Sequence, residues 1–156
     1  MWFLWLTVIV FNLVFLFMPK KLTIIELFTT CLFAMVLQQV VDLALDLKLD
    51  LYGYFTKGIQ WRYLIPIFGI YPAVNAIFLN YYQYMKNYKQ RLLYIIGCSI
   101  FSVIYEALAI KTGYFYHHYW KLLYSGIAYP FLLLLLLLVL EWVRRMIHYQ
   151  YDRVTR

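Results

Sequence analysis

Five long apolar segments make up most of the chain and constrain its fold more than any other feature. Each has a length within the roughly 17–25 residues that a helix needs to cross the hydrocarbon core of a bilayer. These runs do not alternate in polarity as a membrane β-strand does, and a backbone in lipid must satisfy its own hydrogen bonds, so we predict helices. The predicted spans are Trp2–Met18, Leu22–Leu45, Tyr63–Tyr82, Leu92–Ile110 and Leu122–Val143.

The composition indicates that lipid is the main solvent. Hydrophobic residues make up 65% of the chain and charged residues only 13%, against about 25% charged in soluble domains. We therefore predict an all-α integral membrane protein, a single transmembrane domain over residues 1–156 with five spans and a basic tail at residues 144–156. The net charge of +7 is spread between the apolar runs, which indicates membrane topology and argues against nucleic-acid binding.

The distribution of lysine and arginine predicts the orientation. With the N-terminus outside, the inner segments hold nine basic residues: Lys20, Lys21, Lys86, Lys89, Arg91, Arg144, Arg145, Arg153 and Arg156. The outer segments hold five: Lys48, Lys57, Arg62, Lys111 and Lys121. Since basic residues are enriched in cytoplasmic segments, the sequence predicts an N-out, C-in topology. Many of the 17 tyrosines cluster near predicted helix ends, and we interpret these as an interfacial belt and not as an aromatic ligand cage: Tyr52, Tyr54, Tyr63, Tyr81, Tyr82, Tyr84, Tyr114, Tyr116 and Tyr119.

An internal repeat is present, with its first copy at residues 46–72 and its second copy at residues 106–130. Each copy has an acid, a Gly-Tyr-Phe triplet seven positions later, a tryptophan followed by a basic residue, and a Tyr-Pro pair. The first copy holds Asp46, Gly53-Tyr54-Phe55, Trp61-Arg62 and Tyr71-Pro72, and the second holds Glu106, Gly113-Tyr114-Phe115, Trp120-Lys121 and Tyr129-Pro130. The intervals after the triplet differ by one residue. We predict that helices two–three and four–five are two copies of one hairpin, arranged as parallel repeats, with a bend at each Tyr-Pro pair.

Ionisable side chains inside the predicted spans mark the candidate site, because each costs at least about 2.5–3.5 kcal/mol at the bilayer centre. Helical spacing places the polar groups of helix two on one stripe and those of helix four on another. The candidate ligand- or ion-binding residues are Gln39, Asp42, Asp46, Asn75, Ser102, Glu106 and Ser125. In the alternative interpretation, Asp46 pairs with Arg62 or Lys48, and Glu106 with Lys121 or Lys111, and these interfacial ion pairs fix the hairpins.

Motifs for catalysis and for metals are missing from the sequence. It holds no GxSxG elbow, P-loop or dinucleotide fingerprint, so we predict no cofactor and no metal. The pair His117-His118 has no accompanying metal-ligand spacing and is interpreted as a solvated loop pair. The leading hypothesis is a non-enzymatic membrane protein that binds a lipid, a small ligand or a partner protein through an outward-facing polar cavity. The alternatives are a proton- or cation-coupled transporter or channel acting as a homodimer, and a membrane-embedded enzyme.

A resemblance adds a biological setting. The residues that carry it are Asp46, Gly53-Tyr54-Phe55, Trp61-Arg62-Tyr63, Asn80-Tyr81, Glu106, Gly113-Tyr114, Tyr119-Trp120-Lys121 and Tyr124-Ser125. In these motifs the chain resembles an uncharacterised family of small multi-pass membrane proteins of spore-forming Gram-positive bacteria. The resemblance implies a bacterial cytoplasmic membrane location and a link to sporulation or to the cell envelope.

Overall fold

The computed structural model describes residues 2–54 and 61–154 of the chain and is 81% helical. The helices are α1 (Trp2–Phe17), α2 (Ile24–Asp42), α3 (Leu64–Gly69), α4 (Tyr71–Tyr82), α5 (Tyr88–Lys111) and α6 (Leu122–Val154). α2 continues into a π-helical turn at Leu43–Lys48, and a short 3₁₀ turn, Trp61–Tyr63, precedes α3. Two three-residue strands, β1 (Tyr52–Tyr54) and β2 (Phe115–His117), complete the fold. The expectation of an all-α membrane protein is confirmed at this level.

Four of the described helices are long and apolar enough to cross a membrane. They cover Ile24–Lys48, Leu64–Tyr82, Tyr88–Lys111 and Leu122–Arg153. The apolar helix α1 has 16 residues and is about 24 Å long, which is shorter than the roughly 30 Å hydrocarbon core. α6 continues as helix to Val154, so most of the predicted basic tail is helical.

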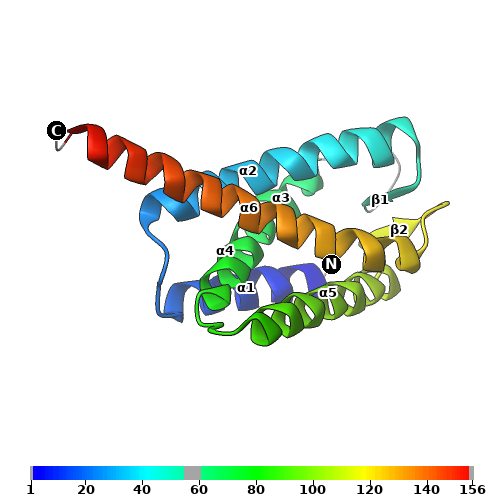
Figure 1. The fold of residues 1–156 in the computed structure, drawn as a ribbon. Helices are drawn as coiled ribbons and strands as arrows, with labels where there is room; N and C mark the ends of the chain where they lie inside the picture. Colours follow the sequence, from blue (N-terminus) through cyan, green and yellow to red (C-terminus); the bar gives the residue numbers. More distant parts are fainter. Residues whose placement is uncertain (1, 55–60, 155–156) are drawn as a thin grey trace.

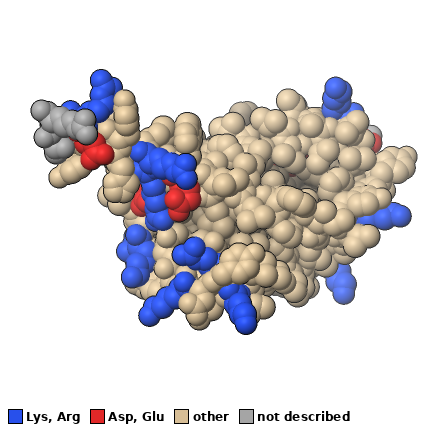
Figure 2. Space-filling model, in the orientation of Figure 1, with Lys and Arg blue, Asp and Glu red and all other residues tan. Residues whose placement is uncertain are grey.

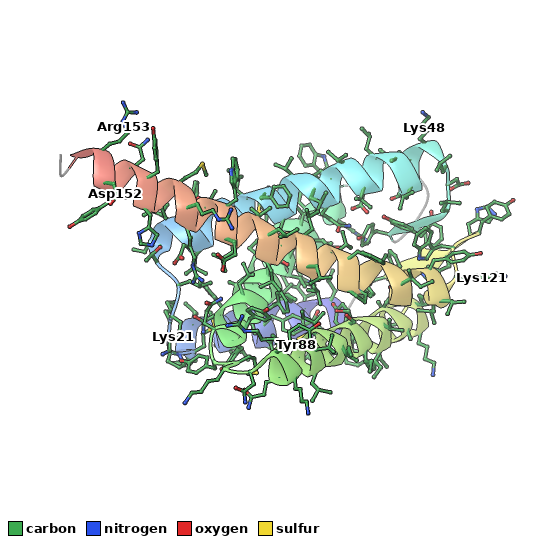
Figure 3. All side chains as sticks on the ribbon, viewed as in Figure 1. Lys21, Lys48, Tyr88, Lys121, Asp152 and Arg153 are labelled. Atoms are coloured by element: carbon green, nitrogen blue, oxygen red, sulfur yellow. The ribbon has the colours of Figure 1, made fainter. Side chains whose placement is uncertain are left out.

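Charged residues lie at the two ends of the long dimension of the molecule. Figure 2 shows lysine and arginine side chains at both ends and a broad band without charges between them. In Figure 3, Lys21 lies toward one end and Lys48 and Lys121 lie at the other. An apolar band between two charged ends is the distribution that a bilayer selects.

Local sequence signals explain where two of the helices begin. α2 starts with a capping box, in which Thr23 and Glu26 each bind the other's backbone N–H group, and this satisfies two donors at the helix start. The third span is broken where α3 ends at Gly69 and α4 begins at Tyr71. Pro72 follows directly and has no N–H group to donate. Pro130, the proline of the second Tyr-Pro pair, lies inside the continuous α6.

Specific contacts hold the end of the bundle opposite the strands. Asn80 of α4 is fully buried; it accepts a hydrogen bond from the Lys21 N–H group (2.7 Å) and donates one to the Pro19 carbonyl (2.9 Å). Arg144 of α6 donates to Glu26 of α2 at 2.5 Å. This ion pair joins α2 to α6 near their crossing point, and from there the two helices diverge toward the strands (Figure 1).

Candidate ligand cavity between α2 and α6

The strands form a small ribbon that covers the open end of the diverging helices. β1 and β2 pair antiparallel, with Tyr52 opposite His117 and Tyr54 opposite Phe115. Gly113, at the end of α5, has a φ of +75°, a conformation that glycine adopts without strain. It turns the chain from the helix into β2. The ribbon therefore brings side chains from two distant loops over the ends of α2 and α5.

A cavity of about 500 Å³ fills the wedge between α2 and α6, with α4, α5 and the ribbon completing its wall. Two of its lining residues, Phe101 and Phe131, are 54% and 68% exposed. The cavity therefore reaches the apolar side of the molecule, and Figure 2 shows the surface hollowed between α2 and α6. Aliphatic side chains such as Leu133 and Leu136 line part of the cavity, and Glu106 lines the part next to the ribbon, where it contacts His117.

Glu106 of α5 is the central polar group of the cavity wall, and it is only 6% exposed. Its Oε1 atom contacts the His117 Nε2 atom and accepts from the Ser125 hydroxyl, both at 2.7 Å. Its Oε2 atom accepts from the Tyr129 hydroxyl at 2.5 Å. Ser125 in turn accepts from the Trp120 indole N–H group at 2.7 Å. α5, α6 and the ribbon are thus joined through one buried carboxylate.

Asp42 of α2 is a second buried carboxylate, and it lies one hydrogen bond behind the wall. It accepts from the Tyr52 hydroxyl at 2.8 Å and from the Gln38 amide at 2.9 Å. Both donors line the cavity, whereas Asp42 itself does not. Asp42 is therefore linked to the cavity through the side chains of Tyr52 and Gln38.

Six tyrosines line the cavity: Tyr52, Tyr54, Tyr71, Tyr105, Tyr114 and Tyr129. Several of their hydroxyl groups bond to one another. The Tyr54 and Tyr71 hydroxyls are 2.7 Å apart, and Tyr114 donates to Tyr105 at 2.7 Å. Tyr105 then donates to Thr7 of α1 at 3.2 Å. These bonds tie the ribbon to α4, α5 and α1.

Three of these residues belong to the non-helical segments that form or adjoin the ribbon: Tyr52, Tyr54 and Tyr114. We call them the ribbon tyrosines. Burial raises the pKa of each of them well above the ordinary tyrosine value. The neighbouring charge of Asp42 raises the pKa of Tyr52 further, and nearby phenols do the same for Tyr54 and Tyr114. The ribbon tyrosines are therefore neutral hydrogen-bonding groups throughout the physiological pH range.

The structure brings together most of the residues that the sequence nominated. Asn75, Ser102, Glu106 and Ser125 line the cavity. Asp42 lies directly behind the wall, and Asp46 is buried in the π-helical turn but does not line the cavity. Gln39 is exposed on α2, and its neighbour Gln38 takes the place in the wall.

Three of the basic residues considered for interfacial pairs are exposed: Arg62, Lys111 and Lys121. In the described part of the chain, the partners of Glu106 are His117, Ser125 and Tyr129.

Sequence reasoning missed three kinds of site residue: His117, the lining tyrosines and Trp120. The interpretation of His117-His118 as a solvated pair is wrong for His117, because its side chain is only 13% exposed. It fits His118, whose side chain is 49% exposed. Strand alternation was the available signal, because neighbouring residues of an extended segment point to opposite faces. Tyr52, Tyr54 and Tyr114 were assigned to a membrane interface, but the ribbon directs these three side chains into the cavity wall, while Tyr71, Tyr105 and Tyr129 reach it from α4, α5 and α6.

Fold and composition together define the class: a multi-pass helical membrane protein with a partly polar cavity that opens on the apolar side of the molecule. Comparison of the chain with protein-family models, with curated proteins and with solved structures found no match. Among the described residues, no group of three or more His, Cys, Asp or Glu side chains is placed to hold a metal ion. The geometry of the cavity is therefore the basis for assigning a function.

Proposed function

We propose that the protein is a non-enzymatic membrane protein that binds one small ligand or lipid molecule in the cavity between α2 and α6. The observation that carries the proposal is the cavity of about 500 Å³ with Glu106 buried in its wall. Ligand sites are typically apolar cavities of roughly this size with a few convergent polar groups. A buried carboxylate within a membrane bundle is costly and marks a functional site by default.

The distribution of charge supports a bacterial cytoplasmic membrane protein with its N-terminus outside. Lys21 and Arg153, which Figure 3 labels, lie toward the end that carries the C-terminus, and Arg144 lies beside Glu26 near the start of α2. Fewer basic residues, among them Lys48 and Lys121, lie at the ribbon end. With this orientation the cavity lies in the outer half of the bilayer and opens sideways between two helices. The resemblance to small membrane proteins of spore-forming bacteria supports the same location and a role in the cell envelope.

The same orientation makes α1 a fifth, short span, and the pairing of the ribbon supports two repeated hairpins. α1 packs on α3 and α4, and its Thr7 accepts a hydrogen bond from Tyr105 of α5. α2 packs on α4, and α5 packs on α6. β1 holds Gly53-Tyr54, while β2 begins just after Gly113-Tyr114, and the two segments pair antiparallel. A two-fold axis along the membrane normal relates two parallel repeats in this manner.

Binding is favoured over catalysis by the way in which Glu106 is held. Its two oxygen atoms share three hydrogen bonds with His117, Ser125 and Tyr129, so it is an acceptor already engaged by the protein. The Ser125 hydroxyl donates to this carboxylate and contacts no histidine in the described residues, so it lacks the base that activates a nucleophile.

Ion transport is the remaining alternative function. It is tested by a flux assay in liposomes with a pH gradient. Proton flux that Asp42→Asn abolishes would favour a transporter.

The binding proposal is tested with protein purified in a mild detergent and examined by native mass spectrometry. The expected result is a bound small molecule or lipid that is retained by the wild type and lost when Ala128→Phe fills the cavity. Ala128 lines the cavity, whereas Ala107 of α5 does not, so Ala107→Phe is the matched control for the added volume. The proposal is wrong if the wild type carries only bulk detergent and lipid and both variants carry the same.

A further inference from the structure

The charges around the cavity are unbalanced in a way that indicates the chemistry of its ligand. Buried ionic groups are normally paired, because an unpaired charge in a low-dielectric site is strongly disfavoured. Glu26, at the opposite end of α2, follows this rule, since its buried carboxylate is paired with Arg144 at 2.5 Å. The same helix therefore provides an internal reference for how this protein pairs a buried acid.

Asp42 departs from that reference. It is 6% exposed, and its hydrogen-bond donors Tyr52 and Gln38 are both neutral. Glu106 contacts His117, but the histidine stands behind the carboxylate and does not line the cavity. Even a protonated His117 balances only one of the two carboxylates. No lysine or arginine lines the cavity in the described part of the chain. A cation bound in the cavity would therefore supply the counter-charge that these two carboxyl groups lack in the described part of the chain.

The shape of the wall specifies the kind of cation. The six tyrosines, with Phe115 and Trp120, present aromatic rings to the ribbon end of the cavity. The negative face of an aromatic ring attracts organic cations, and groups of such rings recognise substituted ammonium ions. Hydroxyl hydrogens of Tyr52, Tyr114 and Tyr129 are directed at Asp42, Tyr105 and Glu106. Those hydroxyls therefore present acceptor lone pairs to a ligand.

The remainder of the cavity is apolar and continues to the side of the molecule. Leu133 and Leu136 line part of it, and the exposed rings of Phe101 and Phe131 lie where it reaches the surface. An alkyl chain attached to the cation would lie along these side chains, and a ligand dissolved in the bilayer would reach the site from the side.

We propose that the cavity binds a substituted ammonium group carried on an apolar chain, with the cation among the ribbon-end aromatic rings beside Glu106. This inference rests on the proposed function and specifies its ligand class. Two sources share this chemistry: a free long-chain amine or quaternary ammonium compound, and a lipid with an ammonium headgroup.

The test compares three probes of equal chain length on protein in nanodiscs made only of phosphatidylglycerol. Octyltrimethylammonium should bind saturably, and at least about tenfold more tightly than octanol or octanoate, as measured by isothermal titration. Glu106→Gln and Asp42→Asn, which keep shape and remove charge, should each weaken the cation about tenfold and leave octanol unchanged. Glu141→Gln is the control, because it removes the same charge from a residue that is 62% exposed.

Adding phosphatidylethanolamine to the nanodiscs separates the two sources. Competition with the octyltrimethylammonium probe identifies a lipid headgroup as the occupant, and absence of competition identifies a free amine. The inference is overturned if octanol or octanoate binds as tightly as the cation to the wild type, a comparison that needs no variant to fold. If octanol binds and Ala128→Phe abolishes its binding, the ligand cavity stands and only the cation class fails. If no probe shows binding sensitive to Ala128→Phe, the proposed function fails as well.

Discussion

Replacing Ser125 by alanine removes the one hydroxyl that links Trp120 to Glu106. The Ser125 side chain is 5% exposed, donates to the Glu106 carboxylate at 2.7 Å and accepts from the Trp120 indole at 2.7 Å. A hydrogen bond to a charged group contributes about 1.5–3 kcal/mol, and a neutral one inside a membrane protein about 0.6 kcal/mol on average. We expect Ser125→Ala to lower the free energy of unfolding by about 2–3 kcal/mol, which corresponds to about 30- to 150-fold in the equilibrium constant.

The measurement is reversible unfolding in mixed micelles with sodium dodecyl sulfate, followed by near-ultraviolet circular dichroism. Ser102→Ala is the control, since the Ser102 hydroxyl also lies at the cavity but donates only to the Cys98 carbonyl of its own helix. Its effect should stay within about 0.5 kcal/mol. A double-mutant cycle with Trp120→Phe should show a coupling of about 0.5–1.5 kcal/mol. The hydrogen-bond network is refuted if Ser125→Ala matches Ser102→Ala and its effect adds to that of Trp120→Phe without coupling.

Three further outcomes are expected. Arg144→Met leaves the Glu26 carboxylate buried without its cation, which should cost about 3–5 kcal/mol in the same unfolding assay, and adding Glu26→Gln should restore most of the loss; equal instability of the double variant would contradict a buried ion pair. The ribbon tyrosines have a raised pKa in the folded protein, so the stability linked to them is complete below about pH 10 and is lost as the pH rises further. Tyrosinate absorbance should therefore show phenols that ionise only on unfolding, and full titration of the folded protein near pH 10 would contradict their burial. In a background without native cysteines, Lys48→Cys should react with an impermeant thiol reagent from outside intact cells, and Lys89→Cys should react only after permeabilisation; the reverse pattern would invert the proposed topology.

The helices and the acids of the site were predictable because both follow from local physics. Apolar length predicts a membrane helix from the cost of exposing a backbone to lipid, and the predicted span Tyr63–Tyr82 matches the observed Leu64–Tyr82 closely. Helical periodicity placed Ser102 and Glu106 on one face, and both line the cavity. The same periodicity was less reliable for Gln39, because Gln38 and Gln39 are adjacent and either one could lie on the polar face of the helix. Only the packing of α2 places Gln38 in the cavity wall.

The ribbon was not predictable, and it accounts for most of what the sequence interpretation missed. Three-residue strands carry too little pattern to be recognised, and their pairing joins segments about 60 residues apart. Only that pairing carries His117 back over the end of α5 to Glu106 and turns Tyr52 and Tyr54 inward. A tyrosine near a helix end has the same local sequence whether it faces lipid headgroups or a cavity.

The sequence by itself determined that the chain is a helical membrane protein, and it identified Asp42 and Glu106 as the groups whose burial needs a reason. These features depend on the composition of single segments and on the cost of charge in lipid. Only the tertiary structure decided that α2 and α6 diverge from the Glu26–Arg144 ion pair and leave a cavity between them. It also decided which acid has a cation beside it, because pairing depends on which helices meet and not on the residues near each acid in the chain.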